Sequence, residues 1–191
     1  METMKPLAAA LALAVVVPLS ACSQGETTTT ASGETDNANQ TLAAAIGGAP
    51  GLTTVSGALS EAGLADVFDG PGSYTVLAPD DEAFGKLGDK AATLTDEQHR
   101  AQLVAVLRGH ILPGNVTPDA IRKAIAAKKG PVTMTTLADG TVTFSESGED
   151  IAVAGSDGSK AMIDGATITA TNGVVLPIDG LLKKADPAPV T

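Results

Sequence analysis

YTVLAPDDEAF (residues 74–84) is the stretch that decides the fold, because it passes directly from a strand pattern to a helix pattern. Its first half, YTVLAP (74–79), is rich in apolar side chains on alternating positions, as expected of a buried strand. Pro79 has no backbone N–H to donate, so it ends the strand. The second half, DDEAF (80–84), has the residue types that favour the start of a helix. The stretch therefore predicts a buried strand that leads into a capped helix.

The three consecutive carboxylates of this stretch allow two interpretations. In the structural one, Asp80 is the N-cap, and Asp81 and Glu82 lie in the first helical turn, where the helix dipole stabilises negative charge. Phe84 then belongs to the face that packs. In the chemical one, the same acids bind a metal ion or act in acid–base catalysis. The structural use accounts for all three acids, so we expect Asp80 to cap a helix.

The rest of the first half of the chain is predicted to be helical. Residues 93–107 and 116–130 carry apolar side chains at helical spacing, and a shorter segment with the same spacing begins near residue 53. Each of these segments has threonines at its start, and the segment 116–130 closes with a glycine, as helix caps require. The predicted caps are Thr53 or Thr54, Thr95 with Gln98, and Thr117 with a stop at Gly130.

The second half of the chain switches to strand patterns. PVTMTTLADGTVTFSE (131–146) is a pair of alternating runs around Asp139-Gly140, which is a strong hairpin signal. Short strand patterns with Gly- or Asn-containing turns follow between residues 150 and 182. Helices followed by strands, without regular βαβ alternation, predict an α+β domain with largely antiparallel pairing.

Three motifs in this order resemble those of the fasciclin-like domain family. They are the opening stretch, LRGHILPGNVTPDAI (107–121) and NGVVLPIDGLL (172–182), and together they span nearly all of residues 41–185. The resemblance implies a single domain, a bent, largely antiparallel β-sandwich or wedge with helices packed along one edge. It also implies a role in cell adhesion or surface interactions. The motif residues that it singles out as structural are Asp80, Phe84, His110, Pro113, Asn172 and Asp179.

Two residues depart from the family pattern. Gly109 precedes His110 where many members have an aromatic ring, which weakens the transfer of any adhesive role attached to that aromatic–His pair. Pro177 lies inside the last predicted strand. Because proline cannot donate to a sheet ladder, we expect that strand to lie at a sheet edge or to be bulged there.

His110 allows three interpretations, since histidine titrates near neutral pH. It is flanked by apolar residues, and the resemblance implies a buried histidine that hydrogen-bonds within the core. A surface contact and a catalytic role are the alternatives. The sequence contains no nucleophile elbow, no phosphate-binding loop and no dinucleotide fingerprint. We therefore expect no catalytic residue, no cofactor and no metal, and His110 as a structural residue.

The first 40 residues predict export and anchoring. An apolar run after Lys5 ends in Leu-Ser-Ala-Cys at Cys22, which resembles the lipobox of bacterial lipoproteins. The expected parts are a signal peptide (1–21), a lipidated Cys22 followed by a flexible tether (to residue 40), the domain (41–185) and a disordered tail (186–191). An ordinary cleaved signal with a chance cysteine is the alternative. Residues 23–40 contain no large apolar side chain, so we expect them to make almost no contact with the domain.

Composition narrows the function classes. A net charge of −10 repels phosphate backbones, which argues against nucleic-acid binding. An aromatic content of 2% disfavours recognition of sugars or bases by stacking. Three hypotheses follow. The first is a monomeric, lipid-anchored adhesion or interaction module of the cell envelope, facing periplasm or cell surface, with an unknown surface or matrix partner. The others are a small-molecule or lipid carrier and an envelope enzyme.

Overall fold

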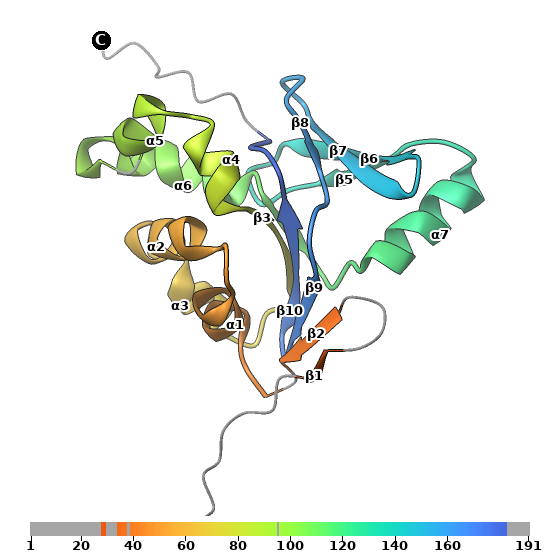
Figure 1. The fold of residues 1–191 in the computed structure, drawn as a ribbon, viewed down its shortest axis with the longest axis horizontal. Coiled ribbons are helices and arrows are strands. Elements are labelled where there is room, and N and C mark those ends of the chain that lie inside the picture. Colours follow the sequence, from red (N-terminus) through yellow and green to blue (C-terminus); the bar gives the residue numbers. More distant parts are fainter. Residues whose placement is uncertain (1–27, 30–33, 38, 95, 183–191) are drawn as a thin grey trace, which may run out of the picture.

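The structure is a computed structural model, and it describes residues 28–29, 34–37, 39–94 and 96–182 (Figure 1). Its helices are α1 (Leu42–Gly48), α2 (Thr53–Glu61), α3 (Ala65–Phe68), α4 (Asp81–Gly85), α5 (Asp89–Leu94), the 3-10 turn η1 (Glu97–His99), α6 (Arg100–Arg108) and α7 (Pro118–Lys128). Its strands are β1 (Thr28–Thr29), β2 (Glu34–Asn37), β3 (Tyr74–Pro79), β4 (Ile111–Pro113), β5 (Val132–Thr135), β6 (Thr141–Ser147), β7 (Asp150–Gly155), β8 (Lys160–Met162), β9 (Thr167–Ala170) and β10 (Gly173–Ile178).

The strands form two sheets. The larger has the order β1-β2-β9-β10-β3-β4, and the smaller is the meander β5-β6-β7-β8. Two pairs are parallel, β10 with β3 and β2 with β9, and the other pairs are antiparallel. The predicted α+β domain with largely antiparallel strands is therefore confirmed.

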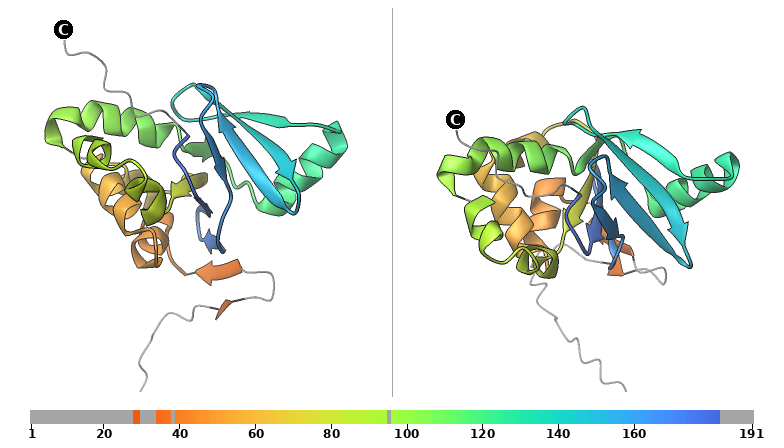
Figure 2. Two further views of the ribbon diagram at one scale, coloured as in Figure 1. Left: turned by 45° about the horizontal axis from the view of Figure 1, so that its top comes forward. Right: turned by 90° about the horizontal axis from the view of Figure 1, so that it is seen from above.

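Both faces of the larger sheet are buried, each against a different layer. Side chains alternate between the faces of a strand. Val76 and Val175 accordingly pack into the core formed with α1–α6, whereas Leu77 and Leu176 pack into the core formed with β6, β7 and α7. Figures 1 and 2 show the helices α1–α6 on one side of the larger sheet and the smaller sheet with α7 on the other. The helices α1–α6 thus pack along one side of the two-sheet structure, against a face of the larger sheet.

Two of the predicted helix caps are present. Asp80 has extended backbone angles, and its Oδ1 accepts the N–H of Ala83 at 2.6 Å, which caps α4. Thr117 caps α7 in the same way through Ala120, at 3.3 Å. The opening stretch therefore forms the strand and capped helix that its pattern predicts.

Other predicted helix boundaries are shifted. Thr53 and Thr54 are inside α2, whose N-cap is Leu52 and has no side-chain hydrogen bond. Lys129, with φ of 54°, takes the left-handed position at the end of α7, one residue before Gly130. Helix α6 begins at Arg100, after a 3-10 turn, and Thr95 lies outside the described residues. Local patterns thus locate these helices but not their first and last residues.

The hairpin around Asp139-Gly140 joins β5 to β6 as predicted. Asp139 has φ of 58°, which aspartate tolerates better than most residues. The backbone of Thr136 closes the turn by donating to Gly140 at 2.9 Å. The antiparallel register then pairs Met134 with Val142.

The expectation that residues 23–40 make almost no contact with the domain is wrong for β2. Residues Glu34–Asn37 pair in parallel with Thr167–Ala170 of β9 and extend the larger sheet. Gln40 also accepts the backbone N–H of Thr171 at 2.9 Å. An edge strand needs only backbone groups to pair, so the lack of apolar side chains in β2 did not prevent it.

Of the two alternatives expected for the last strand, an edge position or a bulge, the edge position is wrong. Strand β10 lies inside the larger sheet, between β9 and β3. Its pairing with β9 ends at Val175, before Pro177. The carbonyl of Pro177 accepts the N–H of Asp164 at 2.9 Å, so the nitrogen of Pro177 also points to that side and away from β3. The missing N–H therefore falls beyond the end of β9, where no ladder bond is lost.

The core contains few aromatic rings. Phe68 of α3 is fully buried and contacts the ring of Tyr74 at the start of β3, with 5.7 Å between ring centroids and 68° between ring planes. This edge-to-face pair fastens α3 to the larger sheet.

Candidate functional site

The three motifs meet at the centre of the larger sheet. Strands β3 and β10 run in parallel register from Tyr74–Gly173 to Pro79–Ile178, and β4 pairs with the other edge of β3. The structure therefore brings together the first, second and third motif, although they are far apart in the chain. The polar residues of these motifs are the candidates for chemistry.

The acids of the opening stretch serve two different helices. Asp80 caps its own helix α4, whereas Asp81 accepts the N–H groups of Thr54 at 2.7 Å and Thr53 at 3.4 Å, at the start of α2. The hydrogen bond from the Thr54 backbone, the largest cause, lowers the pKa of Asp81. Glu82 is exposed. In the part of the chain that the structure describes, no three His, Cys, Asp or Glu side chains are grouped so that they could hold a metal ion.

His110 is buried, with both ring nitrogens in hydrogen-bonding distance of backbone groups. Nδ1 lies 2.8 Å from the carbonyl oxygen of Val106, and Nε2 accepts the N–H of Leu182 at 2.9 Å. A carbonyl can only accept, so Nδ1 carries the proton and the ring is the neutral tautomer. His110 belongs to the second motif, and its side chain joins Val106 of α6 to Leu182 at the end of the third motif.

The environment of His110 opposes its protonation. Burial lowers the pKa of His110 from 6.5 to about 4, against smaller raising effects of the Val106 carbonyl and the Asp157 charge. A proton on Nε2 would also face the N–H of Leu182, which is itself a donor. His110 therefore stays neutral at physiological pH, and the buried ring has no free nitrogen for proton transfer.

Asn172 connects the turn before β10 to the helical layer. Its Oδ1 accepts the N–H of Leu42 at 2.8 Å, and its Nδ2 donates to the carbonyls of Phe68 at 2.6 Å and Gly70 at 3.0 Å. An amide both accepts and donates, which suits this position between the start of α1 and the end of α3. The side chain is fully used in holding these segments together.

The remaining motif residues also serve packing and pairing. Asp179 accepts the N–H of Met162 at 2.7 Å, which joins the end of β10 to β8. Phe84 is buried in the core beneath the helices. Pro113 is exposed at the end of β4.

Thr75 is a buried polar residue that our sequence analysis did not single out. Its hydroxyl donates to the carbonyl of Gly114 at 2.8 Å and accepts the N–H of Val116 at 2.8 Å. The side chain holds the turn after β4 against β3. A threonine inside an apolar strand pattern was the available signal, since a fully buried hydroxyl needs a partner.

Two further observations concern the membrane. Cys22, the predicted lipid-bearing residue, lies outside the described residues. Within those described, no helix combines the length and the apolar composition that crossing a bilayer requires.

A hollow of about 500 Å³ opens at the surface beside β2 and β9. Its floor contains the buried side chains Ala45, Leu52 and Ile168, and exposed residues such as Pro50 and Asp164 form its rim. The carboxylate-bearing residues Asp80 and Asp164 line it, whereas no Lys or Arg among the described residues does. The hollow is therefore apolar at its base and acidic at its rim.

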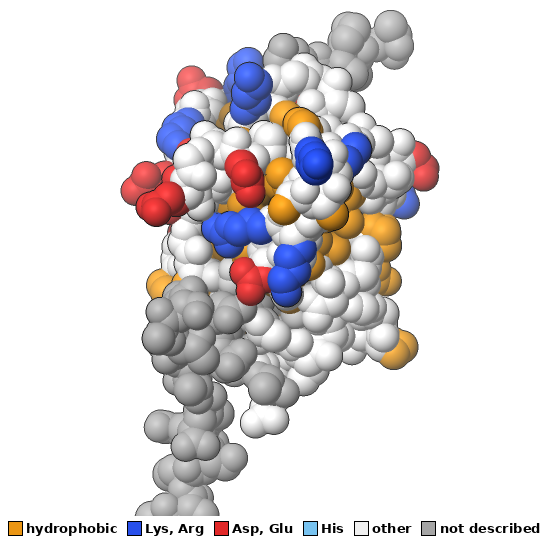
Figure 3. All heavy atoms as spheres, turned by 90° about the vertical axis from the view of Figure 1, so that its right-hand side faces the viewer, with side chains coloured by type: hydrophobic (Ala, Val, Ile, Leu, Met, Phe, Trp, Pro, Cys, Tyr) orange, Lys and Arg blue, Asp and Glu red, His pale blue; other side chains and the backbone are white. Residues whose placement is uncertain are grey.

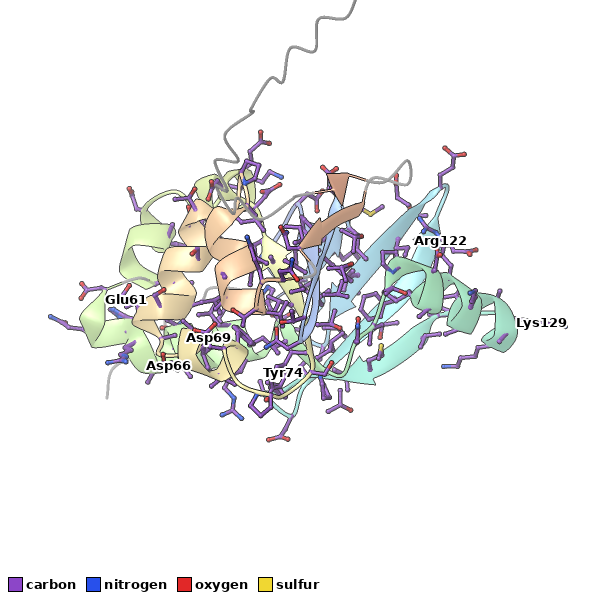
Figure 4. All side chains as sticks on the ribbon, turned by 90° about the horizontal axis from the view of Figure 1, so that it is seen from below. Glu61, Asp66, Asp69, Tyr74, Arg122 and Lys129 are labelled. Carbon is purple, nitrogen blue, oxygen red and sulfur yellow. The ribbon has the colours of Figure 1, made fainter. Side chains whose placement is uncertain are left out.

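The helix α7 has more basic than acidic residues, with Arg122, Lys123 and Lys128 against Asp119. Figure 4 shows Arg122 and Lys129 on α7, away from Glu61, Asp66 and Asp69 on the helical layer. Figure 3 faces the α7 end, where Lys and Arg side chains lie among hydrophobic ones with some Asp and Glu between them. One of these cations is engaged within the chain, because Arg122 donates to the carbonyl of Glu149 at 3.2 Å.

Comparison with known proteins gives consistent matches. The sequence profile of the Fasciclin domain matches residues 50–184. A protein of Synechocystis sp., Protein sll1483, is 28% identical over 149 residues, which are 78% of this chain and 75% of that protein. Transforming growth factor-beta-induced protein ig-h3 of Sus scrofa is 31% identical over 131 residues, which are 68% of this chain but 17% of that protein.

A solved structure matches at the level of the fold. It is a FAS1 domain pair from the insect cell adhesion molecule Fasciclin I, with a TM-score of 0.68 and 15% sequence identity. The match covers 77% of this chain and 52% of that chain.

Proposed function

The chain belongs to the fasciclin domain family, and from that premise we propose that it is an adhesion or protein-interaction module held at the cell envelope. The family is linked to cell adhesion proteins, of which the insect Fasciclin I is one. The proposed partner is a surface or matrix protein, and the proposed module acts as a monomer. The proposal assigns the chain no catalytic activity.

One observation carries this proposal: the polar side chains of the motifs make hydrogen bonds to backbone groups within the fold. Asp80 and Asp81 cap two helices, Asn172 bonds three backbone groups, and both ring nitrogens of His110 have backbone partners. A catalytic group must reach its substrate, whereas the neutral, buried His110 reaches only the backbone. An envelope enzyme is for this reason the least supported alternative.

The carrier hypothesis has one observation in its favour, the hollow beside β9. A carrier normally buries most of its ligand in a deep pocket. This hollow has exposed residues such as Gly48, Pro50 and Gly165 in its walls and opens to solvent. Such a shape supports contact with part of a larger partner better than enclosure of a small one.

The proposed anchoring rests on Leu19-Ser20-Ala21-Cys22 after an apolar run. In the lipoprotein pathway the cysteine carries the lipid, and several acyl chains hold a protein firmly at a bilayer. Cys22→Ser should therefore release the protein from the membrane fraction and leave the melting temperature of the domain unchanged. Fractionation after a high-salt wash measures the release, with Ser23→Ala as a matched control that should stay bound. A Cys22→Ser protein that remains in the membrane fraction would contradict the anchor.

Adhesion is tested in cells. A deletion strain should attach less to surfaces or to neighbouring cells, and expression of the full chain should restore attachment. Crosslinking of intact cells followed by purification of the chain should recover a surface or matrix protein. Normal attachment of the deletion strain would remove the main support for the adhesion proposal.

A further inference from the structure

The edge of β9 is occupied by a segment that is poorly suited to it. Strand β2 has the sequence Glu-Thr-Asp-Asn and lies at the periphery of the larger sheet (Figure 1). Of the strands that the structure describes, β1 alone lies beyond it. None of its four residues is apolar, so its pairing with β9 depends on backbone hydrogen bonds. Such an edge is a ready template for another extended chain.

The hollow lies where side chains of a strand on this edge would enter. The parallel register places Thr35 opposite Ile168 and Asn37 opposite Ala170. Ile168 and Ala170 belong to the core beneath the helices, and directly opposed residues share one face of a sheet. Asn37 and Ile168 both line the hollow, whose floor is apolar. A strand with aliphatic side chains at the two positions of Thr35 and Asn37 would therefore fill it.

We propose that the edge of β9 and the adjoining hollow form a binding site for an extended peptide segment of a partner protein. The peptide pairs in parallel with β9 and places two aliphatic side chains, two residues apart, in the hollow. Strand β2 is the weak intramolecular occupant that this peptide replaces. This mode of recognition combines main-chain pairing for affinity with side-chain pockets for specificity. The inference rests on the proposed interaction function and names the class of partner.

The charge around the site narrows the peptide further. Asp80 and Asp164 line the hollow, and no Lys or Arg does within the part of the chain that the structure describes. The chain has a net charge of −10. Basic residues beside the two aliphatic ones would therefore be attracted, and the β2 sequence Glu-Thr-Asp-Asn contains none. Both the apolar pattern and the charge of β2 differ from those of the peptide that fits best.

The main experiment uses the full chain with Thr35→Pro and Asp36→Pro together. Neighbouring residues of a strand direct their N–H groups to opposite sides, so this pair removes the donor that faces β9. The probe is a fluorescent peptide Lys-Thr-Val-Thr-Val-Lys, and its control is Lys-Val-Val-Thr-Thr-Lys, which has the same composition but cannot place both valines on one face. Fluorescence anisotropy should show that the double-proline chain binds the first peptide at least about tenfold more tightly than the natural chain does (a difference of ~1.4 kcal/mol). The double-proline chain should also bind the first peptide at least about tenfold more tightly than it binds the control peptide.

Three results would contradict the peptide site. No saturable binding to the double-proline chain, or equal affinity for the two peptides, would overturn the proposal. A dimer of the natural chain in gel filtration at the same concentrations would assign the edge to a second copy and also overturn it. If the peptide does not bind but the deletion strain attaches less than the natural strain, only this site is refuted. If the deletion strain attaches normally, the proposed function itself loses its support.

A second variant keeps the test valid if the double-proline chain does not fold. Thr35→Val changes the position paired with Ile168, which lines the hollow, and Thr28→Val makes the same change at the position paired with Asp36. Thr35→Val should raise the melting temperature by about 2–4 °C more than Thr28→Val. Equal melting temperatures for the two variants would show that the hollow does not accept side chains from this edge.

Discussion

Strands β10 and β2 both pair with β9, one on each side, yet they are held in opposite ways. Val174, Val175, Leu176 and Ile178 of β10 have no exposed surface, and they pack into the cores on both faces of the sheet. Strand β2 offers only polar residues at the sheet periphery. Burial of apolar surface therefore concentrates stability in β10, whereas backbone pairing alone makes β2 replaceable.

Leu176→Ala should have the largest effect, because it leaves a cavity between the two sheets. Leucine-to-alanine changes in buried positions cost about 2–5 kcal/mol. Thr35→Ala in β2 is the matched control and should cost less than about 0.5 kcal/mol, because this peripheral strand pairs through backbone groups that the change leaves in place. Urea denaturation measures both. If the two variants lost similar free energy, the contrast between the strands would be wrong.

Acid should weaken the hydrogen bond that His110 makes to Leu182, beyond the end of β10. The pKa of His110 is lowered in the folded protein to about 4 and is near 6.5 when unfolded, so the unfolded state binds the proton first. Its contribution is complete above pH 6.5 and is lost as pH falls through 4, which amounts to roughly 3 kcal/mol. The free energy of unfolding of the natural chain should fall over this range more steeply than that of His110→Gln. Parallel curves would contradict the lowered pKa.

His110→Ala at neutral pH should cost about 1–3 kcal/mol, because it removes two hydrogen bonds and leaves a cavity. Peptide binding or attachment should then fall only as far as the amount of folded protein falls. Thermal unfolding and an attachment assay on the same preparation separate the two effects. A variant with the natural melting temperature and no attachment would make His110 a contact residue instead.

Asp81→Ala should cost about 0.5–2 kcal/mol, the range for losing a helix N-cap. The variant removes the carboxylate that bonds Thr53 and Thr54 at the start of α2. Glu82→Ala removes a neighbouring exposed acid and should change the free energy of unfolding by less than about 0.5 kcal/mol. Equal effects of the two variants would show that general charge, and not capping, is what stabilises this region.

Asp80 and Asp81 show how far the sequence predicts the structure. The role of Asp80 could be predicted, because its hydrogen bond reaches only three residues along the chain. Asp81 caps a helix 27 residues away, which depends on how α2 packs against α4, and no local pattern contains that information. The same distinction separates the confirmed cap at Thr117 from the wrong one at Thr53 or Thr54.

The two errors about strands have one cause. Apolar patterning predicted β10, but its place inside the sheet depends on β9 ending before Pro177, which no residue of β10 determines. Strand β2 has no apolar pattern, and its pairing is specified by the free backbone groups of β9. Sequence patterns report which side chains are buried, whereas edge pairing is a property of the partner strand.

The contact between Phe68 and Tyr74 has a practical consequence for spectroscopy. Tyr74 is the single tyrosine of a chain without tryptophan, so fluorescence excited beyond the absorption of phenylalanine comes from one ring packed edge-on against α3. A change in that signal reports the separation of α3 from the start of β3. Far-ultraviolet circular dichroism reports the whole backbone instead. Coincident transitions by the two methods would show that this corner unfolds together with the rest of the domain.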